Sequence, residues 1–235
     1  MRRAELALGA VGAAIAWSAP APAAHLPLLA EAFRIRRRLT DDRGIALTFD
    51  DGPHPEGTPA VLEALAEAGA KATFFLVGEQ VERWPELAAA IAAAGHEIAL
   101  HGHRHRLLLR RTPFAVARDL DRAARAIGEA TGRKPTCYRP PYGVFSSAAL
   151  ALVRLRGWTP FLWSTWGRDW EPRATPAGIA RRATSRLRGG DVVLLHDADH
   201  YSSPGSWRRT VAALPRVLEA VEALEVPCVR LTQST

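Results

Sequence analysis

Short apolar runs alternate with Ala-rich amphipathic stretches along the chain from Gly44 onward. The runs are short and end at Gly, Pro or polar residues, which is typical of buried strands. They predict strands at Ile45–Phe49, Ala72–Val77, Glu97–Leu100, Thr136–Arg139, Thr159–Trp163, Asp191–Leu195 and Pro227–Leu231. Strands that alternate with helices favour a parallel sheet covered by helices. We therefore predict an α/β fold, a distorted (β/α) barrel of about seven parallel strands with outer helices, and hold an open doubly wound sheet as the second choice.

The stretches between the strands carry helix signals at both ends. A Thr that can cap free N–H groups precedes a Pro suited to the first helical position at Thr58-Pro59, Thr112-Pro113 and Thr175-Pro176. Pro85 suits a fourth helix start. Glycines that suit C-terminal stops follow helical stretches at Gly69, Gly95, Gly132 and Gly157.

The first forty residues follow a different pattern. Met1-Arg2-Arg3 precedes an apolar stretch and then Ala21-Pro22-Ala23, which is the order of a secretory signal. An interrupted membrane anchor followed by a cluster of arginines is the alternative. We expect residues 1–40 to form a signal peptide or anchor plus a basic linker, and residues 41–235 to form one folded domain. We expect export to the cell envelope or beyond, with membrane-anchored and cytoplasmic locations as alternatives.

Composition narrows the range of partners. The net charge is +7, and 29 of the 31 basic residues are Arg, since Lys71 and Lys134 are the only lysines. These arginines are spread over the chain and do not interleave with aromatic residues, which argues against a nucleic-acid platform. Attraction to an anionic envelope polymer is compatible with this charge. Cys137 and Cys228 do not form a Cys-x-x-Cys spacing, which excludes a cysteine-built zinc site. We expect two separate buried thiols, with a disulfide between them as the alternative if the chain is exported.

Candidate metal ligands follow two of the predicted strands. Asp50 and Asp51 are adjacent at the end of the first strand, where their mutual repulsion calls for a positive partner. His101 and His105 follow the third strand four residues apart, a spacing that puts both imidazoles on one face of a helical turn. One carboxylate and two imidazoles make a common open zinc site. Asp51, His101 and His105 would supply that set.

Other polar and aromatic groups also follow strands. Arg139 stands before a stiff Pro-Pro turn and would pair with a carboxylate such as Asp50. His196 ends the sixth strand, where it suits proton transfer. The segment from Trp163 to Trp170 holds three Trp around Asp169 and suits either sugar stacking or core packing. These positions share the carboxyl ends of predicted parallel strands, where barrel enzymes build their sites.

The motifs together resemble the polysaccharide deacetylase family, the NodB-homology or carbohydrate esterase family 4 domain. The resemblance runs from about Gly44 to Leu231 and rests on Thr48–Gly52, Arg139–Gly143 and Leu194–His196. It implies a metal-dependent hydrolase that removes N-acetyl groups from amino-sugar polymers or glycoconjugates such as peptidoglycan or chitin-like chains. The implied residues are the catalytic Asp50, His196, Arg139 and Asp169, the metal ligands Asp51, His101 and His105, and the substrate-binding Tyr142, Trp170 and Leu194.

The resemblance also sets expectations for cofactor and partners. The metal would be Zn²⁺, with Co²⁺ or Mn²⁺ as alternatives, and the partner an acetylated carbohydrate. We expect no nucleic acid and no protein partner, and keep membrane association through the N-terminal segment as an option. Two positions depart from the family motifs, because Gly102 stands where Ser or Thr is usual and Trp166 where an Asp is usual. We expect a looser histidine loop from the first and an altered substrate preference from the second.

Three other functions remain open at this point. An O-acetyl carbohydrate esterase would use the same chemistry, and a degenerate member of the fold would bind carbohydrate without turnover. A phosphohydrolase built on Asp50-Asp51 is disfavoured, because neither a glycine cradle nor a Lys accompanies the pair. The loop from Ala198 to Trp207, which contains Tyr201, would shape substrate choice or simply be a surface loop.

Overall fold

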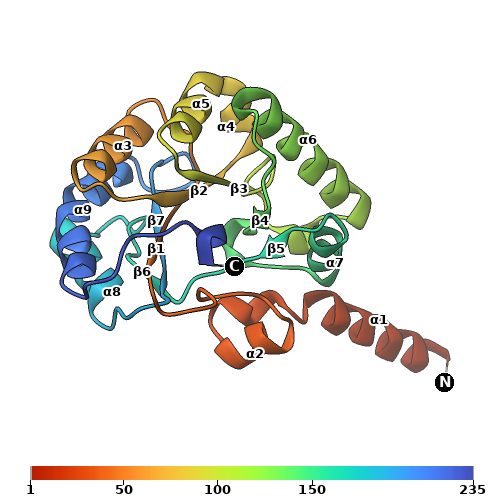
Figure 1. Ribbon diagram of the computed structural model, residues 1–235. Helices are drawn as coiled ribbons and strands as arrows, with labels where there is room; N and C mark the ends of the chain where they lie inside the picture. Colours follow the sequence, from red (N-terminus) through yellow and green to blue (C-terminus); the bar gives the residue numbers. More distant parts are fainter. Residues whose placement is uncertain (1, 235) are drawn as a thin grey trace.

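The computed structural model describes residues 2–234 and contains one curled parallel sheet (Figure 1). In chain order its strands are β1 Ala46–Asp50, β2 Ala72–Leu76, β3 Glu97–Leu100, β4 Cys137–Tyr138, β5 Thr159–Pro160, β6 Thr165–Trp166 and β7 Val192–His196. Their spatial order is β5-β4-β3-β2-β1-β7-β6, and every neighbouring pair is parallel. The central strands β1 and β2 are buried at all five positions, as expected of strands covered on both faces.

Helices surround this sheet in an arc, and the N-terminal segment lies along the remaining side (Figure 1). The α-helices are α1 Arg2–Ser18, α2 Pro27–Ala32, α3 Gly57–Glu67, α4 Gly78–Arg83, α5 Pro85–Ala93, α6 Pro113–Thr131, α7 Ser147–Leu155, α8 Pro176–Thr184 and α9 Ser206–Glu222. Short 3₁₀ turns cover Ala21–Ala24, Leu108–Arg110, Pro141–Gly143 and Leu231–Ser234. The predicted distorted (β/α) barrel is thereby confirmed.

Two of the three predicted Thr caps are confirmed. The Thr112 hydroxyl accepts from the Ala115 N–H at 3.2 Å, and Thr175 caps α8 in the same way. The prediction for Thr58 is wrong, because α3 begins at Gly57, two residues before the expected Pro59, and the Thr58 hydroxyl has other partners. It accepts from the His54 N–H at 2.7 Å and donates to the Asp197 carboxylate. Here the side chain ties two loops together rather than capping a helix.

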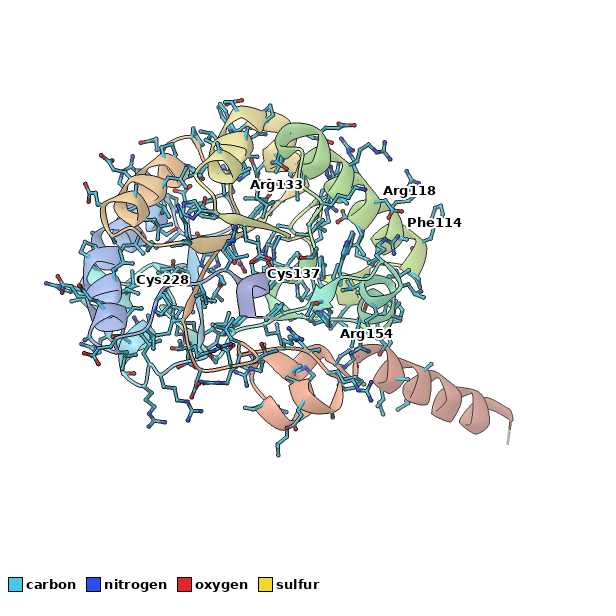
Figure 2. All side chains as sticks on the ribbon, viewed as in Figure 1. Phe114, Arg118, Arg133, Cys137, Arg154 and Cys228 are labelled. Carbon is cyan, nitrogen blue, oxygen red and sulfur yellow. The ribbon has the colours of Figure 1, made fainter. Side chains whose placement is uncertain are left out.

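The seventh predicted strand is wrong, and a different one takes its place. Pro227–Leu231 forms only an isolated bridge between Cys228 and Ile45 before the chain turns into a 3₁₀ helix. Strand β6, at the sheet edge, has no counterpart among the predicted strands because two half-buried residues leave no apolar run. Cys137 and Cys228, both labelled in Figure 2, are free thiols.

The N-terminal segment packs against the sheet instead of trailing away as a linker. Ala23, Ala30 and Ile35 belong to the hydrophobic core. Arg36 forms a parallel bridge with Phe161, just beyond β5, and the Leu39 N–H donates to the Gly190 carbonyl at 2.8 Å, just before β7. Residues 34–39 therefore cover the opening between the two edges of the half-barrel. No helix among residues 2–234 combines the length and apolarity needed to cross a bilayer. Cleavage or anchoring of this segment stays a prediction.

Candidate metal and catalytic centre

The site begins where β1 ends. Asp50 is the last residue of β1 and lies in register with His196 of β7, so the two strand ends bring a carboxylate and an imidazole to one edge. Asp51 then takes a left-handed backbone conformation with φ 79°. The next residue must be Gly52, because a Cβ there would lie 2.4 Å from a carboxylate oxygen of Asp197. Both aspartates are buried, with about 3% of each residue exposed.

Asp51, His101 and His105 converge as predicted from the sequence. The Asp51 Oδ1 atom lies 3.5 Å from His101 Nε2 and 3.4 Å from His105 Nε2. The His101 Nδ1 atom lies 2.9 Å from the Arg139 carbonyl oxygen, so it carries the proton and leaves Nε2 as a free lone pair facing Asp51. Burial, followed by the nearby Arg139 charge, lowers the pKa of His101 to about 3. Burial and then His101 lower the pKa of His105 to about 2.

These residues fit a divalent cation. Asp51 Oδ1 is buried and has no hydrogen-bond donor among the described residues. Two neutral imidazoles beside such an oxygen present lone pairs to one point, which is favourable only around a cation. Burial raises the pKa of Asp51 to about 7, and a bound cation would keep this carboxylate ionised. Two imidazoles with one carboxylate are a donor set typical of zinc.

A buried ion pair stands beside this group. Arg139 Nη1 donates to Asp50 Oδ1 at 2.6 Å and to the Thr48 hydroxyl at 2.9 Å, and Nη2 donates to the Leu162 carbonyl at 2.8 Å. The guanidinium is fully buried and its centre lies 4.0 Å from the middle of the Phe75 ring. Burial raises the pKa of Asp50, while the charge of Arg139 lowers it. Arg139 therefore favours the ionised form of a carboxylate that its surroundings would otherwise neutralise.

A second pair involves the predicted acid. His196 Nδ1 lies 2.8 Å from Asp169 Oδ1, and the other oxygen of Asp169 accepts from the His196 N–H and the Thr210 hydroxyl, each at 2.7 Å. Burial alone would lower the pKa of His196, but the attraction of Asp169 outweighs it, and Asp51 and Asp50 add to the rise. The pKa of His196 reaches about 10. His196 is held as an imidazolium whose Nε2 lies 4.0 Å from Asp51 Oδ2.

Asp50, His196 and the Asp51–His101–His105 group line one cavity of about 340 Å³. Leu194, Trp170 and Tyr142, the three expected substrate-binding residues, line it, whereas Arg139 and Asp169 lie behind the wall and contact Asp50 and His196. The Trp170 ring lies 5.3 Å from His196. Tyr142 adopts φ 61°, and its largely exposed ring lies against His105 with the ring centres 4.4 Å apart.

Another side chain supports the histidine loop at Gly102, where a Ser or Thr hydroxyl is usual. Gly102 has φ +87°, a conformation that a Ser or Thr would adopt only with strain. The Asp119 carboxylate, from α6, accepts the His103 N–H at 2.7 Å and the Arg104 N–H at 3.3 Å. These bonds fix the backbone between His101 and His105. The looser loop expected from the missing hydroxyl is compensated by a carboxylate that sequence motifs alone do not indicate.

The sequence did not predict His25 as a cavity residue, and it left the role of Tyr201 undecided. His25 lines the cavity, with its ring 5.7 Å from Trp166, and was assigned to the leader because the segment around it looks like one. Tyr201, from the loop of uncertain role, stacks on His105 with ring centres 4.4 Å apart and donates to Glu79 at 2.7 Å. The loop Ala198–Trp207 is therefore part of the site rather than a plain surface loop.

A second group of Asp and His, formed by His54, Asp199 and His200, does not suit a metal. The His54 Nδ1 atom accepts the Gly57 N–H at 2.9 Å and the Glu56 N–H at 3.2 Å. Its Nε2 must then carry the proton, which it donates to Asp199 at 3.2 Å. Without a free lone pair, this imidazole serves as a hydrogen-bonded support for the loop after β1.

The curled parallel sheet thus carries an Asp-His-His group and two charged pairs at the carboxyl ends of its strands. Residues 37–161 match the family model of polysaccharide deacetylases. The chain is 37% identical over 188 residues to a chitooligosaccharide deacetylase of Bradyrhizobium, covering 78% of this chain and 84% of the relative. It is 35% identical over 181 residues to a peptidoglycan-N-acetylglucosamine deacetylase of Bacillus cereus, covering 76% and 81%.

The solved structures agree with the sequence relatives. The crystal structure of the Bc1960 peptidoglycan N-acetylglucosamine deacetylase matches with a TM-score of 0.80 at 26% identity, covering 87% of this chain and 94% of that one. The chain therefore belongs to the polysaccharide deacetylase family, as the motifs predicted.

Proposed function

We propose that this protein hydrolyses N-acetyl groups on amino-sugar polymers or glycoconjugates of the peptidoglycan or chitin type, with a divalent metal. The relatives named above act on such sugars, which supports this substrate class. The observation that carries the proposal is the joint opening of Asp50, the Asp51–His101–His105 group and His196 into one cavity. A base, a cation site and an acid in one small space suit the hydrolysis of an unreactive amide.

Asp51, His101 and His105 would hold the metal, with Zn²⁺ favoured by the donor set and Co²⁺ or Mn²⁺ as alternatives. A divalent ion there supplies a Lewis acid that polarises the acetyl carbonyl and makes a nearby water easier to deprotonate. The neutral state of both imidazoles, produced mainly by burial, leaves their lone pairs ready for this ion. Removal of the metal should therefore stop turnover.

Asp50 takes the proton from the attacking water as the new C–O bond forms. Arg139 keeps this carboxylate ionised and aims it, because one guanidinium nitrogen is bonded to Asp50 and to Thr48 while the other is fixed by a backbone carbonyl. The negative charge that develops on the acetyl oxygen would meet the backbone N–H of Tyr142, whose left-handed conformation sets the direction of that turn.

His196 gives its Nε2 proton to the sugar nitrogen as the C–N bond breaks, leaving acetate and a free amine. A positioned proton donor matters more for an amide than for an ester, because an amide anion is a far poorer leaving group than an alkoxide. The high pKa of His196, sustained by Asp169, keeps the proton in place at neutral pH. This favours N-deacetylation over the O-acetyl esterase alternative. Trp170 and Leu194 would enclose the acetyl methyl group.

Acetate release from N-acetylglucosamine oligomers and from peptidoglycan tests the proposal, measured with added Zn²⁺ or Co²⁺ and with a chelator. We expect metal-dependent acetate from at least one polymer and none from the Asp50→Asn variant, which should still bind metal. Acetate from O-acetylated sugars alone would identify an esterase. Metal binding without turnover of any of these substrates, or failure to bind metal, would favour a degenerate carbohydrate-binding member.

We further propose that the protein acts at the cell envelope or outside the cell. The signal-like order of the first residues and the polymeric substrates named for the relatives support this location. Fractionation of cells expressing a C-terminally tagged chain tests it, and recovery only from the cytoplasm would contradict it.

A further inference from the structure

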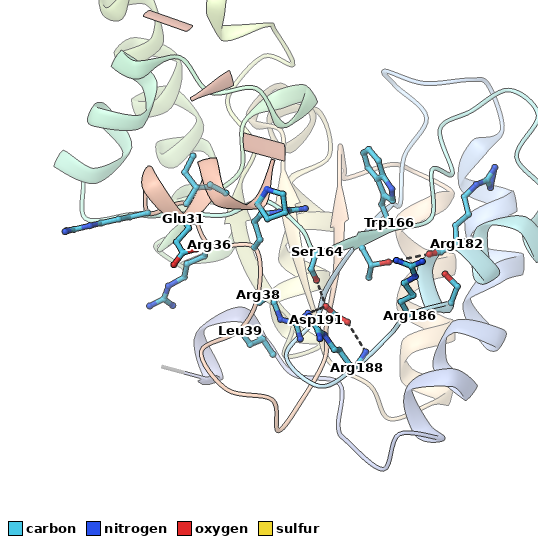
Figure 3. A pocket seen from close by; sticks show the side chains of 17 residues that line it. Glu31, Arg36, Arg38, Leu39, Ser164, Trp166, Arg182, Arg186, Arg188 and Asp191 are labelled. Carbon is cyan, nitrogen blue, oxygen red and sulfur yellow. Dashed lines mark hydrogen bonds and ion pairs between the residues drawn. The ribbon is translucent and has the colours of Figure 1, made fainter. Parts of the chain in front are cut away.

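A basic groove of about 1220 Å³ lies beside the catalytic cavity, between the N-terminal segment and α8 (Figure 3). Residues 34–39 form one wall, and α8 with the loop after it forms the other. Seven arginines line this groove, against the carboxylates of Glu31 and Asp191. The arginine cluster that looked like the flank of a leader segment is therefore folded into a concave surface.

Three of these arginines have protein partners. Arg38 is paired with Asp191, Arg182 lies 3.3 Å from a Glu171 oxygen, and Arg37 Nε donates to the Trp163 carbonyl at 2.9 Å. Burial lowers the pKa of Arg37, and among the described residues it has no carboxylate partner. These contacts shape the floor of the groove but leave positive charge in excess.

The other four arginines are Arg34, Arg36, Arg186 and Arg188. None of them forms an ion pair with a carboxylate in the part of the chain that the structure describes. Arg34 and Arg36 come from one wall of the groove, and Arg186 and Arg188 come from the other. Guanidinium groups bind phosphate and carboxylate through paired N–H donors. The groove has the composition of an anion site.

Trp166 joins the groove to the catalytic cavity, because its indole lines both. Its ring centre lies 5.5 Å from that of Trp170, which in turn contacts His196. An Asp is usual at this position in the family motif, and a carboxylate there would place negative charge at the junction. Trp166 replaces that charge with an aromatic face of the kind that stacks on sugar rings.

We propose that the groove binds a phosphate or carboxylate carried by the glycan substrate on a sugar other than the acetylated one. This inference rests on the proposed function and names an acidic amino-sugar glycan as the preferred substrate class. The anion belongs to the substrate rather than to a membrane surface, because the arginines face a concave groove and that groove shares Trp166 with the catalytic cavity. The arginines without carboxylate partners would then bind the anion of this glycan, and Trp166, which stands where an Asp is usual, would stack on one of its sugar rings.

Matched substrates test this assignment. Deacetylation of neutral N-acetylglucosamine tetramer is compared with tetramers that carry one phosphate, or one carboxylate, at either end. We expect a lower KM for at least one acidic tetramer in the wild type. The Arg34→Gln/Arg186→Gln variant removes one exposed arginine from each wall and should raise that KM roughly three- to tenfold, with kcat and the neutral tetramer unchanged. The difference should shrink as salt is raised.

A control variant separates local from general charge effects. Arg118→Gln/Arg133→Gln removes two exposed arginines on α6 and just after it, neither of which lines the groove (Figure 2). It lowers the net charge equally and should leave every KM unchanged. An equal rise in KM with both double variants would mean that overall charge, not the groove, attracts the substrate, and would overturn the proposal.

A direct binding measurement tests the groove without requiring turnover. Equilibrium dialysis of the acidic tetramers, with chelator present, should show weaker binding by the groove variant than by the wild type, even if no tetramer is deacetylated. Inactivity on all tetramers with groove-dependent binding would refute only the proposed function. Equal affinity of wild type and variant for every tetramer would refute the anion site. Loss of binding to phosphatidylglycerol vesicles alone would reassign the groove to lipid headgroups.

Discussion

The buried pair of Arg139 and Asp50 allows a test of the site that does not require activity. Arg139→Met keeps most of the side-chain length but removes the charge and every N–H donor. Asp50, of which 3% is exposed, then loses a partner at 2.6 Å and keeps no compensating cation from that side. Removing one member of a buried pair costs about 3–5 kcal/mol of unfolding free energy, because the other charge stays buried.

Protonation of Asp50 limits this loss and gives the variant a distinct pH dependence. Burial raises the pKa of Asp50 and Arg139 is the first of the groups that lower it, so the pKa rises further in the variant. A folded-state pKa above the unfolded value stabilises the protein at low pH, and this contribution is lost as pH rises through the folded-state pKa. The unfolding free energy of Arg139→Met, relative to wild type, should therefore fall as pH rises from the Asp50 pKa of the folded wild type to the higher Asp50 pKa of the folded variant, and stay level above it.

Urea unfolding at pH 7, with chelator present, measures the coupling. The wild type is compared with Arg139→Met, Asp50→Asn and the double variant, which removes both charges together. We expect the double variant to lose about 2 kcal/mol less than the sum of the single losses, since neighbouring charged partners couple strongly. Additivity within about 0.5 kcal/mol would refute the argument that Arg139 stabilises the Asp50 charge.

An exposed pair supplies the matched control. Arg122 on α6 forms two hydrogen bonds with Glu82 at 2.8 and 2.9 Å, in geometry as good as that of the buried pair. Because both side chains are substantially exposed, Arg122→Met should cost less than about 1 kcal/mol and leave turnover intact. Arg139→Met should lower kcat at least about 100-fold through loss of the ionised base.

The remaining predictions concern the metal, the acid and the fold. His101→Ala should not retain stoichiometric metal after dialysis, and full metal content would remove it from the ligand set. Asp119→Ala should weaken metal affinity at least about tenfold by freeing the histidine loop, measured by competition with a chelator, and unchanged affinity would make that carboxylate incidental. Asp169→Asn should lower the pKa of His196 and shift the alkaline limb of kcat to lower pH, whereas an unshifted limb would assign the proton donor elsewhere. Burial lowers the pKa of His96 to about 4, so its contribution to stability is complete above about pH 6.5 and is lost as pH falls towards 4. That acid loss should be smaller in His96→Gln, and an identical urea profile would refute it.

The sequence predicts the centre of the sheet better than its edges. Strands β1 to β3 were predicted to within a residue because strands buried on both faces read as continuous apolar runs. Strand β6 has only two half-buried residues and so leaves no such run. Pro227–Leu231 does carry one, but its apolar residues close the amino end of the barrel, where Leu231 N–H bonds Thr73 of β2. An apolar run of this length therefore does not distinguish a strand from a segment that covers the end of the barrel.

The arrangement of the site was predictable in outline because parallel strands end at a common edge. That rule places Asp51, His101 and His196 together without any knowledge of loop shape. The supports behind them were not predicted, since Thr210 and Asp119 belong to none of the motifs, and Thr48 stands in the first motif without a role that its position reveals. Their positions depend on strand register and helix packing, which join residues far apart in the sequence.

The N-terminal segment combines a leader-like sequence pattern with packing into the fold. Charged, apolar and small residues in that order predict a leader, yet Ala23 is fully buried and His25 lines the catalytic cavity. If a signal peptidase does cut after Ala23, it must act before the barrel closes around that residue, because a protease needs an exposed, extended chain. The product would still keep His25, Arg34 and the rest of the groove. Export and a catalytic role for this segment are therefore compatible, provided that cleavage precedes folding.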